Sequence, residues 1–276
     1  MIKTTEWGKR CENRWCGIFF DLVPEALGGA LTYYLIDQLI GKQETIEELI
    51  IDLGSDDNAT ANNAARKLQA NGWMTGTSLV GRKFVGANLS EANLAHANFQ
   101  EAEMSYAKLK GAVLASANMK KAQLDHCTLT GAYLRKAALV ETELEYANMV
   151  DAVLAEANLH KSHLEKANLT GSNLSNADLT NTKLYCANLE NATLTGANLE
   201  NADLRDASLF SAQVKWEQVK FNTETTLPDG TKWTHSTDLN RFSDVHHPEF
   251  WSSENPESPR YDIQGFCCRS KRGNTQ

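Results

Sequence analysis

Histidine and cysteine are the residues of this chain that could bind a metal or do redox chemistry. His246 and His247 are adjacent, and His235 lies nearby. A structural zinc site needs four ligands, usually in closely spaced pairs, and no second histidine pair or C-x-x-C motif accompanies these residues. The six cysteines, at positions 11, 16, 127, 186, 267 and 268, do not have the spacing of a secreted disulfide framework. We therefore expect no metal, no cofactor and a reducing compartment.

The charge balance and the missing motifs narrow the class of protein further. The 276 residues include 27 Lys and Arg against 35 Asp and Glu, for a net charge of −8, and such a surface does not favour binding to phosphate backbones. The sequence contains no phosphate-binding loop, nucleophile elbow, kinase signature or zinc-protease motif. We expect a protein that is not an enzyme and has no nucleic-acid partner.

One short repeat dominates the chain. Every fifth residue from Leu79 to Val214 is apolar, and 22 of these 28 positions are leucine. Two residues earlier, from Ala87 to Ala212, 21 of 26 positions are alanine and the others are also small. A strand repeats every second residue and a helix every 3.6 residues, so a period of five fits neither. The chain must turn within each unit, and four such units would close a coil of about 20 residues.

Residues 77–221 closely resemble the pentapeptide-repeat family, whose unit is a small residue, Asn or Asp, leucine and two variable positions, as in the segment ANLSE at 87–91. The resemblance implies a right-handed, four-sided β-helix. A narrow interior explains the alanines, because packing density limits the volume that can be enclosed. We expect an all-β solenoid, a right-handed quadrilateral β-helix of about seven coils, with a small N-terminal α-helical cap and an irregular C-terminal cap.

The segments on either side of the repeat are expected to cover its ends, since both ends of a solenoid expose unpaired edges and apolar core. Residues 43–76 contain two helical patterns, the second over 56–70 with Ser55 as its N-cap. Residues 222–252 combine turn signals with aromatic side chains, which is typical of an irregular cap. Residues 253–276, rich in polar side chains, are expected to be disordered.

Residues 1–42 contain the stretch that bears on location. Its apolar part, 17–41, is interrupted by Asp21, Glu25 and Asp37. A spanning helix needs about 20 apolar residues, and an acidic side chain at its centre costs about 2.5–3.5 kcal/mol. Two interpretations stay open. The resemblance to bacterial relatives with this layout favours a membrane-spanning anchor and a membrane-associated bacterial protein, whereas a core helix beside the cap would leave the protein cytoplasmic.

Reading the repeat with a period of 20 assigns its outward residues to four faces, and one face is distinct. It combines carboxylates with tyrosines, a composition found in protein-binding surfaces, although aromatic stacking on a solvated face produces the same pattern. The candidate partner-binding residues on this face are Glu103, Tyr106, Asp125, Glu143, Glu145, Tyr146, Glu165, Tyr185, Asp203 and Asp206.

Two functions from different classes fit these features. The first is a rigid scaffold, a monomer tethered to a membrane through residues 17–41, that presents this face to an unknown protein partner. The second follows from the family resemblance, because some members imitate B-form DNA and bind a type II topoisomerase (gyrase). Residues 79–214 hold 15 acidic and 12 basic side chains, a balance that disfavours phosphate mimicry. We therefore expect the scaffold and keep DNA mimicry as the alternative.

Overall fold

The computed structural model describes residues 45–259. The chain divides into two compact units, Met1–Glu47 and Glu48–Gln276, and nearly all the described residues belong to the second. The apolar segment 17–41 lies outside the described residues, so its two interpretations stay predictions. Within residues 45–259 no helix combines the length and the apolar character needed to cross a membrane.

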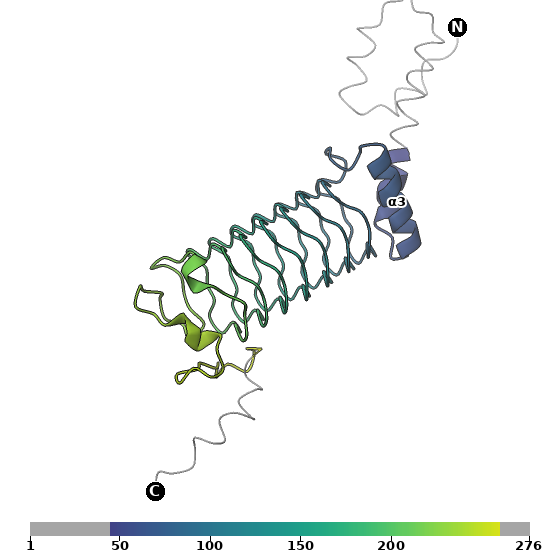
Figure 1. Ribbon diagram of the computed structural model, residues 1–276. Helices are drawn as coiled ribbons and strands as arrows, with labels where there is room; N and C mark the ends of the chain where they lie inside the picture. The colour runs from purple at the N-terminus through teal and green to yellow at the C-terminus, as the bar shows by residue number, and fades with distance from the viewer. Residues whose placement is uncertain (1–44, 260–276) are drawn as a thin grey trace, which may run out of the picture. The chain divides into compact units, whose positions relative to one another are not determined.

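The repeat winds into a four-sided solenoid (Figure 1). Within the described residues, parallel bridges join residues 20 apart, and along one side they run from Lys83 to Asp203. Three more series of bridges, on the other sides, begin at Asn88, Asn93 and Asn98. Each bridge is a single residue rather than an extended strand, because the chain turns again after a few residues. Each coil therefore contains four five-residue units, as the period of the sequence predicted.

The interior of the solenoid is the stack of apolar residues that defines the repeat. From Leu79 to Leu209 each of these side chains is buried, with an exposed fraction of 3% or less. Phe84 and Phe99 meet edge to face, with ring centroids 5.6 Å apart. Val214, the last apolar position of the predicted repeat, is only half-buried, because the chain leaves the coil there. Burial of one leucine contributes about 1.5–3 kcal/mol, so this stack is the main source of stability.

The corners of the coils form at the last residue of each unit. All 27 such positions from 81 to 211, of which 21 are not glycine and six are, have φ between +51° and +76°. This left-handed region strongly disfavours β-branched side chains. None of the 27 residues is Val, Ile or Thr, whereas eight of the 27 residues directly before them are. One of the two apparently variable positions is therefore restricted by the backbone.

Helices cover the N-terminal end of the solenoid. Residues 45–53 are helical, and helix α3 follows at Asn58–Ala70. The buried residues of these helices are Leu49, Ile50, Leu53, Ala61, Ala64, Ala65 and Leu68. The small residues of α3 allow it to approach the coil closely, and Asn58 Nδ2 donates to Ser90 O at 3.0 Å.

The N-cap of α3 differs from the prediction. Asp57, not Ser55, is the cap, and its carboxylate accepts a hydrogen bond from Thr60 N at 2.8 Å. The carbonyl of Ser55 instead accepts a hydrogen bond from Asn88 N at 2.8 Å. This bond ties Ser55 to the first coil, so the helix begins after it.

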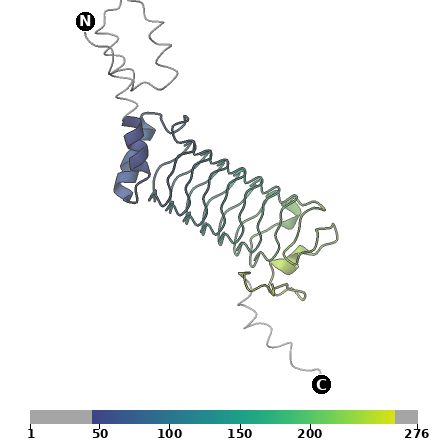
Figure 2. The same ribbon diagram turned by 180° about the vertical axis from the view of Figure 1, so that it is seen from behind.

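The C-terminal end is covered by irregular chain (Figure 2). Two short 3₁₀ helices, η2 at Trp216–Gln218 and η3 at Leu239–Phe242, flank a turn in which Thr226 and Lys232 form an antiparallel bridge. The sequence predicted that residues 253–259 belong to a disordered tail. The structure instead packs this segment against the rest of the protein, and Ser253 is only 1% exposed. Polar contacts with the solenoid, described below, hold this segment, and composition alone did not reveal them.

Candidate functional site

One side of the solenoid, which we call the acidic face, carries all ten residues selected from the sequence. It consists of the outward residues of the units whose buried residues are Met104, Leu124, Leu144, Leu164, Leu184 and Leu204. Each unit contributes one residue to a first column just before the buried residue, one to a second column just after it, and one to a corner column. Bridges between successive coils keep each column in register. Glu103, Glu143 and Asp203 belong to the first column; Asp125, Glu145, Glu165 and Tyr185 to the second; Tyr106, Tyr146 and Asp206 to the corner.

The corner column contains a ladder of three stacked rings. Tyr106 and His126 stack with centroids 5.0 Å apart and planes 2° from parallel, and His126 and Tyr146 stack at 4.9 Å and 7°. The coil spacing of about 4.8 Å imposes this geometry. Both tyrosines are among the residues selected from the sequence, whereas His126, which the 20-residue period places directly between them, is not.

The two ends of the acidic face are ion-paired. Lys83 Nζ lies 3.1 Å from a Glu103 carboxylate oxygen, and Arg205 binds Asp203 at 2.6 Å. Burial would raise the pKa of Asp203, but the hydrogen bonds from Arg205 and its charge outweigh that effect, so the pKa lies below its usual value of 3.8. These two acidic residues are therefore already neutralised by neighbours.

The middle of the second column holds three carboxylates on successive coils, those of Asp125, Glu145 and Glu165. Asp125 accepts a hydrogen bond from Glu145 N at 3.0 Å. Burial raises the pKa of Glu165, and its Oε2 atom is buried without a hydrogen-bond partner among the described residues. Lys183 Nζ pairs with the other oxygen, Oε1, at 3.8 Å. Negative charge therefore accumulates in the middle of the face.

The segment 253–258 lies against the C-terminal part of the corner column. Asn255 Nδ2 donates to Tyr185 OH at 2.8 Å and to Asp206 Oδ2 at 3.0 Å. The Ser253 hydroxyl donates to the other carboxylate oxygen of Asp206. Tyr185 and Asp206, which the sequence placed on an exposed surface, are thus engaged by the chain itself.

Lys166 joins this segment to the ring ladder. Its Nζ donates to Tyr146 OH at 3.0 Å, lies 5.2 Å from the centroid of that ring, and pairs with Glu257 at 3.1 Å. The hydrogen bonds to Tyr146 and Glu257 raise the pKa of Lys166, so the amine is protonated at neutral pH. The corner column therefore runs without a break from stacked rings to a bound peptide segment.

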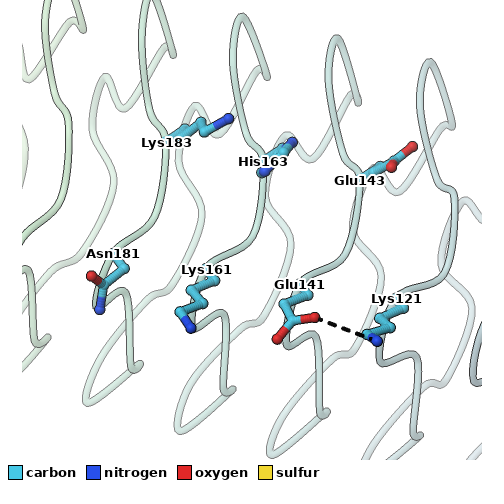
Figure 3. A pocket seen from close by; sticks show the side chains of 7 residues that line it. All are labelled: Lys121, Glu141, Glu143, Lys161, His163, Asn181 and Lys183. Atoms are coloured by element: carbon cyan, nitrogen blue, oxygen red, sulfur yellow. Dashed lines mark ion pairs between the residues drawn. The ribbon is translucent and has the colours of Figure 1, made fainter.

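A hollow of about 500 Å³ opens beside the first column (Figure 3). Its lining residues are Lys121, Glu141, Glu143, Lys161, His163, Asn181 and Lys183. Lys121 and Glu141 form an ion pair along one edge of it at 3.8 Å. Cations and carboxylates alternate in this lining, so the hollow does not resemble the uniformly negative groove expected of a DNA mimic.

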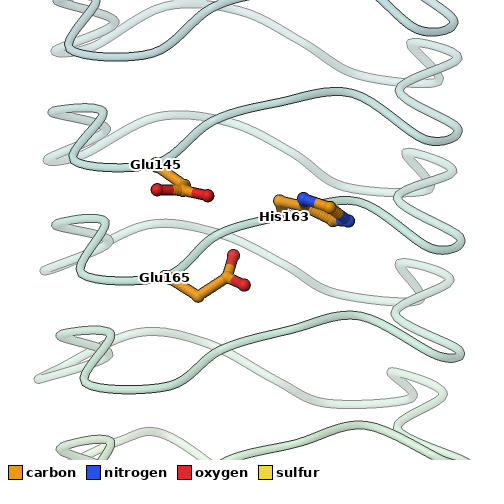
Figure 4. A group of neighbouring side chains, drawn as sticks. All are labelled: Glu145, His163 and Glu165. Atoms are coloured by element: carbon orange, nitrogen blue, oxygen red, sulfur yellow. The ribbon is translucent and has the colours of Figure 1, made fainter.

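Glu145, His163 and Glu165 are the described residues that come together in a possible ligand set for a metal ion (Figure 4). One ligand atom from each lies within 4.8 Å of the other two. The two glutamates are neighbours in the second column, and His163 stands in the first column beside them. The sequence led us to expect no metal site, because Glu145 lies 18 residues before His163, outside the close spacing of a zinc motif.

Comparison with known proteins identifies the repeat. Residues 74–209 match the family model "Pentapeptide repeats", with 8 copies, in stretches 74–110, 92–131, 132–171 and 172–209. No curated protein sequence matches the chain.

Several solved structures are similar to the repeat region. HetL, a pentapeptide repeat protein involved in heterocyst differentiation regulation in the cyanobacterium Nostoc sp. strain PCC 7120, is 26% identical over 56% of this chain and 89% of its own, with a TM-score of 0.30. QnrB1, a plasmid-mediated fluoroquinolone resistance protein, is 18% identical over 56% of this chain and 88% of its own, with a TM-score of 0.42. A pentapeptide repeat protein of the Arabidopsis thaliana thylakoid lumen is 23% identical over 51% of this chain and 70% of its own, with a TM-score of 0.24.

Proposed function

Since this chain belongs to the pentapeptide-repeat family, whose fold is the right-handed quadrilateral β-helix, we propose that it is a non-enzymatic scaffold that presents the acidic face to a protein partner. The scaffold is a monomer of about seven coils with a helical N-terminal cap and an irregular C-terminal cap. One observation carries the proposal: the chain's own segment 253–258 already binds the corner column through Asp206 and Lys166 and the second column through Tyr185. A peptide segment can therefore be held on this face by polar contacts.

The chemistry of the face favours an extended partner segment that carries arginine or lysine. Tyr106 and Tyr146 are 61% and 46% exposed, and they continue the corner column beyond the part that segment 253–258 covers. The carboxylates of Glu145 and Glu165 lie beside these rings. A guanidinium group can stack on a tyrosine ring and pair with a carboxylate at the same time. Such a partner would therefore contact the rings of the corner column and the carboxylates of the second column together.

The rigidity of the solenoid supports recognition without rearrangement. Every coil is bonded to the next through its backbone; Leu144 N, for example, donates to His163 O at 2.8 Å. The successive residues of each outward column are consequently held about 4.8 Å apart along the axis before any partner arrives. A preorganised surface loses less conformational entropy on binding.

Fluorescence anisotropy with the full-length protein and a labelled arginine-rich nonapeptide tests the proposal. The wild-type protein is expected to bind this peptide but not the same peptide with glutamate in place of arginine. The Tyr146 ring already stacks on His126 and lies under Lys166, so the variant Tyr106→Ser/Tyr146→Ser removes one open ring face, that of Tyr106. A cation–π contact there contributes about 0.5–1 kcal/mol, and its loss should weaken binding about 2- to 5-fold.

Tyr133→Ser is the matched control, because Tyr133 is a comparably exposed tyrosine, at 53%, on another face. Its replacement should leave the affinity for the peptide unchanged. Equal binding of the two peptides, or an equal loss in the control and in the double variant, would contradict the proposed face.

Membrane tethering through residues 17–41 is a separate part of the proposal, supported by the apolar composition of that segment. We expect the protein to sediment with bacterial membranes and to be released by detergent but not by salt. Release by salt alone would remove the tether and leave a cytoplasmic scaffold.

DNA mimicry remains distinguishable by experiment. A DNA mimic would inhibit or protect gyrase, and a supercoiling assay measures this directly. We expect no change in supercoiling at a large excess of this protein, because the lysines of the hollow interrupt the negative charge of the face. Inhibition at stoichiometric concentration would favour the alternative.

A further inference from the structure

We propose that Glu145, His163 and Glu165 form a zinc-binding site on the acidic face. The site lies on two adjacent coils, in the middle of the face, and shares Glu145 and Glu165 with the surface proposed to bind the peptide (Figure 4). Metal binding is measured without any peptide, so the inference does not depend on the proposed function.

The ladder forces two like charges together. Glu145 and Glu165 occupy the same place in their units one coil apart, where the spacing between chains is about 4.8 Å. Like charges directly opposite each other on neighbouring strands are destabilising. Within the described residues the Glu145 carboxylate makes no hydrogen bond or ion pair, and Lys183 approaches Glu165 only to 3.8 Å. A divalent cation between the carboxylates would remove this repulsion.

Glu165 has a buried carboxylate oxygen without a hydrogen-bond partner among the described residues. This oxygen is Oε2, and the side chain as a whole is 21% exposed. A buried polar atom without a partner costs free energy, so the native state gains when a ligand binds it. This unpartnered oxygen is an observation independent of the spacing of the three residues.

His163 makes the ligand set selective. Calcium and magnesium prefer all-oxygen sites, whereas an imidazole nitrogen together with carboxylate oxygens suits zinc. Glu143 and Lys183 flank His163 in the first column, bridged to it on the preceding and following coils. Lys121, Glu141 and Lys161 line the hollow beside it as well, and the lysines disfavour adding a further cation without carboxylates to compensate. Glu145 and Glu165 supply that compensation.

The geometry requires a small contraction. Zinc binds nitrogen and oxygen ligands at about 2.0–2.2 Å, which places tetrahedral ligand atoms about 3.4 Å apart. The three ligand atoms now lie within 4.8 Å of one another, and rotation of the exposed Glu145 side chain can bring them closer. Three protein ligands leave the fourth tetrahedral position to water.

Cobalt(II) titration of the full-length protein, followed by NMR of the histidine imidazoles, tests the site. Cobalt replaces zinc in such sites and broadens nearby signals, and His163→Gln assigns the His163 signal among those of the seven histidines. We expect the His163 signal to disappear first, at about one equivalent of metal. Zinc added afterwards should restore it. Isothermal titration with zinc should show the corresponding event weakened at least about tenfold in Glu165→Gln and in His163→Gln.

Two control variants match the ligands. Glu200 occupies the same place in its unit as Glu165, but the residue two positions before it is Asn198 instead of a histidine. His160 lies on the neighbouring side and is hydrogen-bonded to Thr180 at 2.6 Å. Glu200→Gln and His160→Gln should both leave the titration unchanged. Because all four variants alter outward side chains, unchanged circular dichroism will show that they fold. Broadening of all histidines together, or a zinc affinity that Glu165→Gln does not alter, would overturn the site.

Discussion

The inner and outer columns of the acidic face follow the same backbone but different rules. Inside, Leu124, Leu144 and Leu164 repeat one residue type coil after coil. Outside, the column beside them changes from Glu143 to His163 to Lys183. All four sides share one interior, so every unit meets the same packing demand and the sequence repeats every five residues. Each outer residue meets only its neighbours 20 residues away, so its pattern appears only at that longer period.

This difference separates stability from recognition. The interior fixes the coil and tolerates few residue types, while the exterior varies in charge and shape at little cost in folding free energy. The function of the chain is therefore to be sought in residues related by 20 positions rather than by five. Variants that compare neighbouring inner and outer positions measure how complete this separation is.

The largest effect is expected at the adjacent residues Leu144 and Glu145. Leu144→Lys buries an uncompensated charge and should destabilise the protein by about 3–5 kcal/mol, enough to unfold the middle coils. Glu145→Lys places the same side chain in solvent and should leave the far-UV circular dichroism spectrum intact. Guanidinium denaturation monitored by circular dichroism measures both changes, and equal damage would refute the assignment of the two residues to inside and outside.

The corner residues are expected to tolerate fewer substitutions than the other outward residues, although they too are exposed. Ser116 is exposed but has φ of +56°, so Ser116→Val should destabilise the protein by about 2 kcal/mol through strain in the left-handed region. Ala115→Val, at the preceding position where valine occurs in other units, should change the free energy of unfolding by less than about 0.5 kcal/mol. The difference in denaturation midpoint between the two variants is the measurement, and similar midpoints would show that the corner backbone can relax.

A smaller effect separates two hydroxyl groups in one inner column. Thr142 Oγ1 donates to Met119 O at 3.0 Å, whereas the buried Ser162 hydroxyl one coil further on makes no hydrogen bond to the described residues. Thr142→Ala should therefore lower stability by about 1 kcal/mol, and Ser162→Ala should be neutral or stabilising. Thermal melts of the two variants check this order, which would be reversed if Ser162 were bonded in solution.

The smallest effect is expected from the ion pair of Asp203 and Arg205, because the arginine is largely exposed. Asp203→Asn keeps the shape and should cost about 0.5 kcal/mol at neutral pH. The pKa of Asp203 is lowered in the folded protein, so the unfolded chain binds its proton first. The stabilisation that the ion pair provides is present above pH 3.8, the usual pKa of an aspartate, and is lost as the pH falls through the lower pKa of Asp203 in the folded protein.

Urea denaturation of wild type and Asp203→Asn across this pH range measures the contribution of the pair. The difference between the two proteins should shrink on acidification. A difference that is independent of pH would mean that the pair is not what the substitution removes.

The fold was largely predictable because its cause is local and repeated 28 times. The buried positions of the repeat followed from spacing, and the 20-residue coil followed from spacing together with the resemblance to the pentapeptide-repeat family. The left-handed corners were not predicted, because their signal is the absence of β-branched residues rather than the presence of any one type. Ser55 was mistaken for an N-cap because its bond to Asn88 is a tertiary contact.

The candidate face was predictable only in part. Charge and aromatic content selected ten of its residues, but His126 became meaningful only between Tyr106 and Tyr146, 20 positions to either side. His163 became meaningful only beside Glu145, which lies on the preceding coil. The contacts of Asn255 with Tyr185 and Asp206 span 70 and 49 residues, and no periodicity reaches across the end of a repeat. Such contacts depend on how the final segment folds back.

The bridges between residues 20 apart also govern how this gene product can grow or shrink. Deleting a single five-residue unit would turn everything after it by a quarter revolution, which would transfer each outer column to the adjoining side while leaving the buried stack unaltered. Removing four units would restore the original alignment and only shorten the rod. Lengthening by whole revolutions is therefore the route by which such a molecule can change its reach and keep its surface.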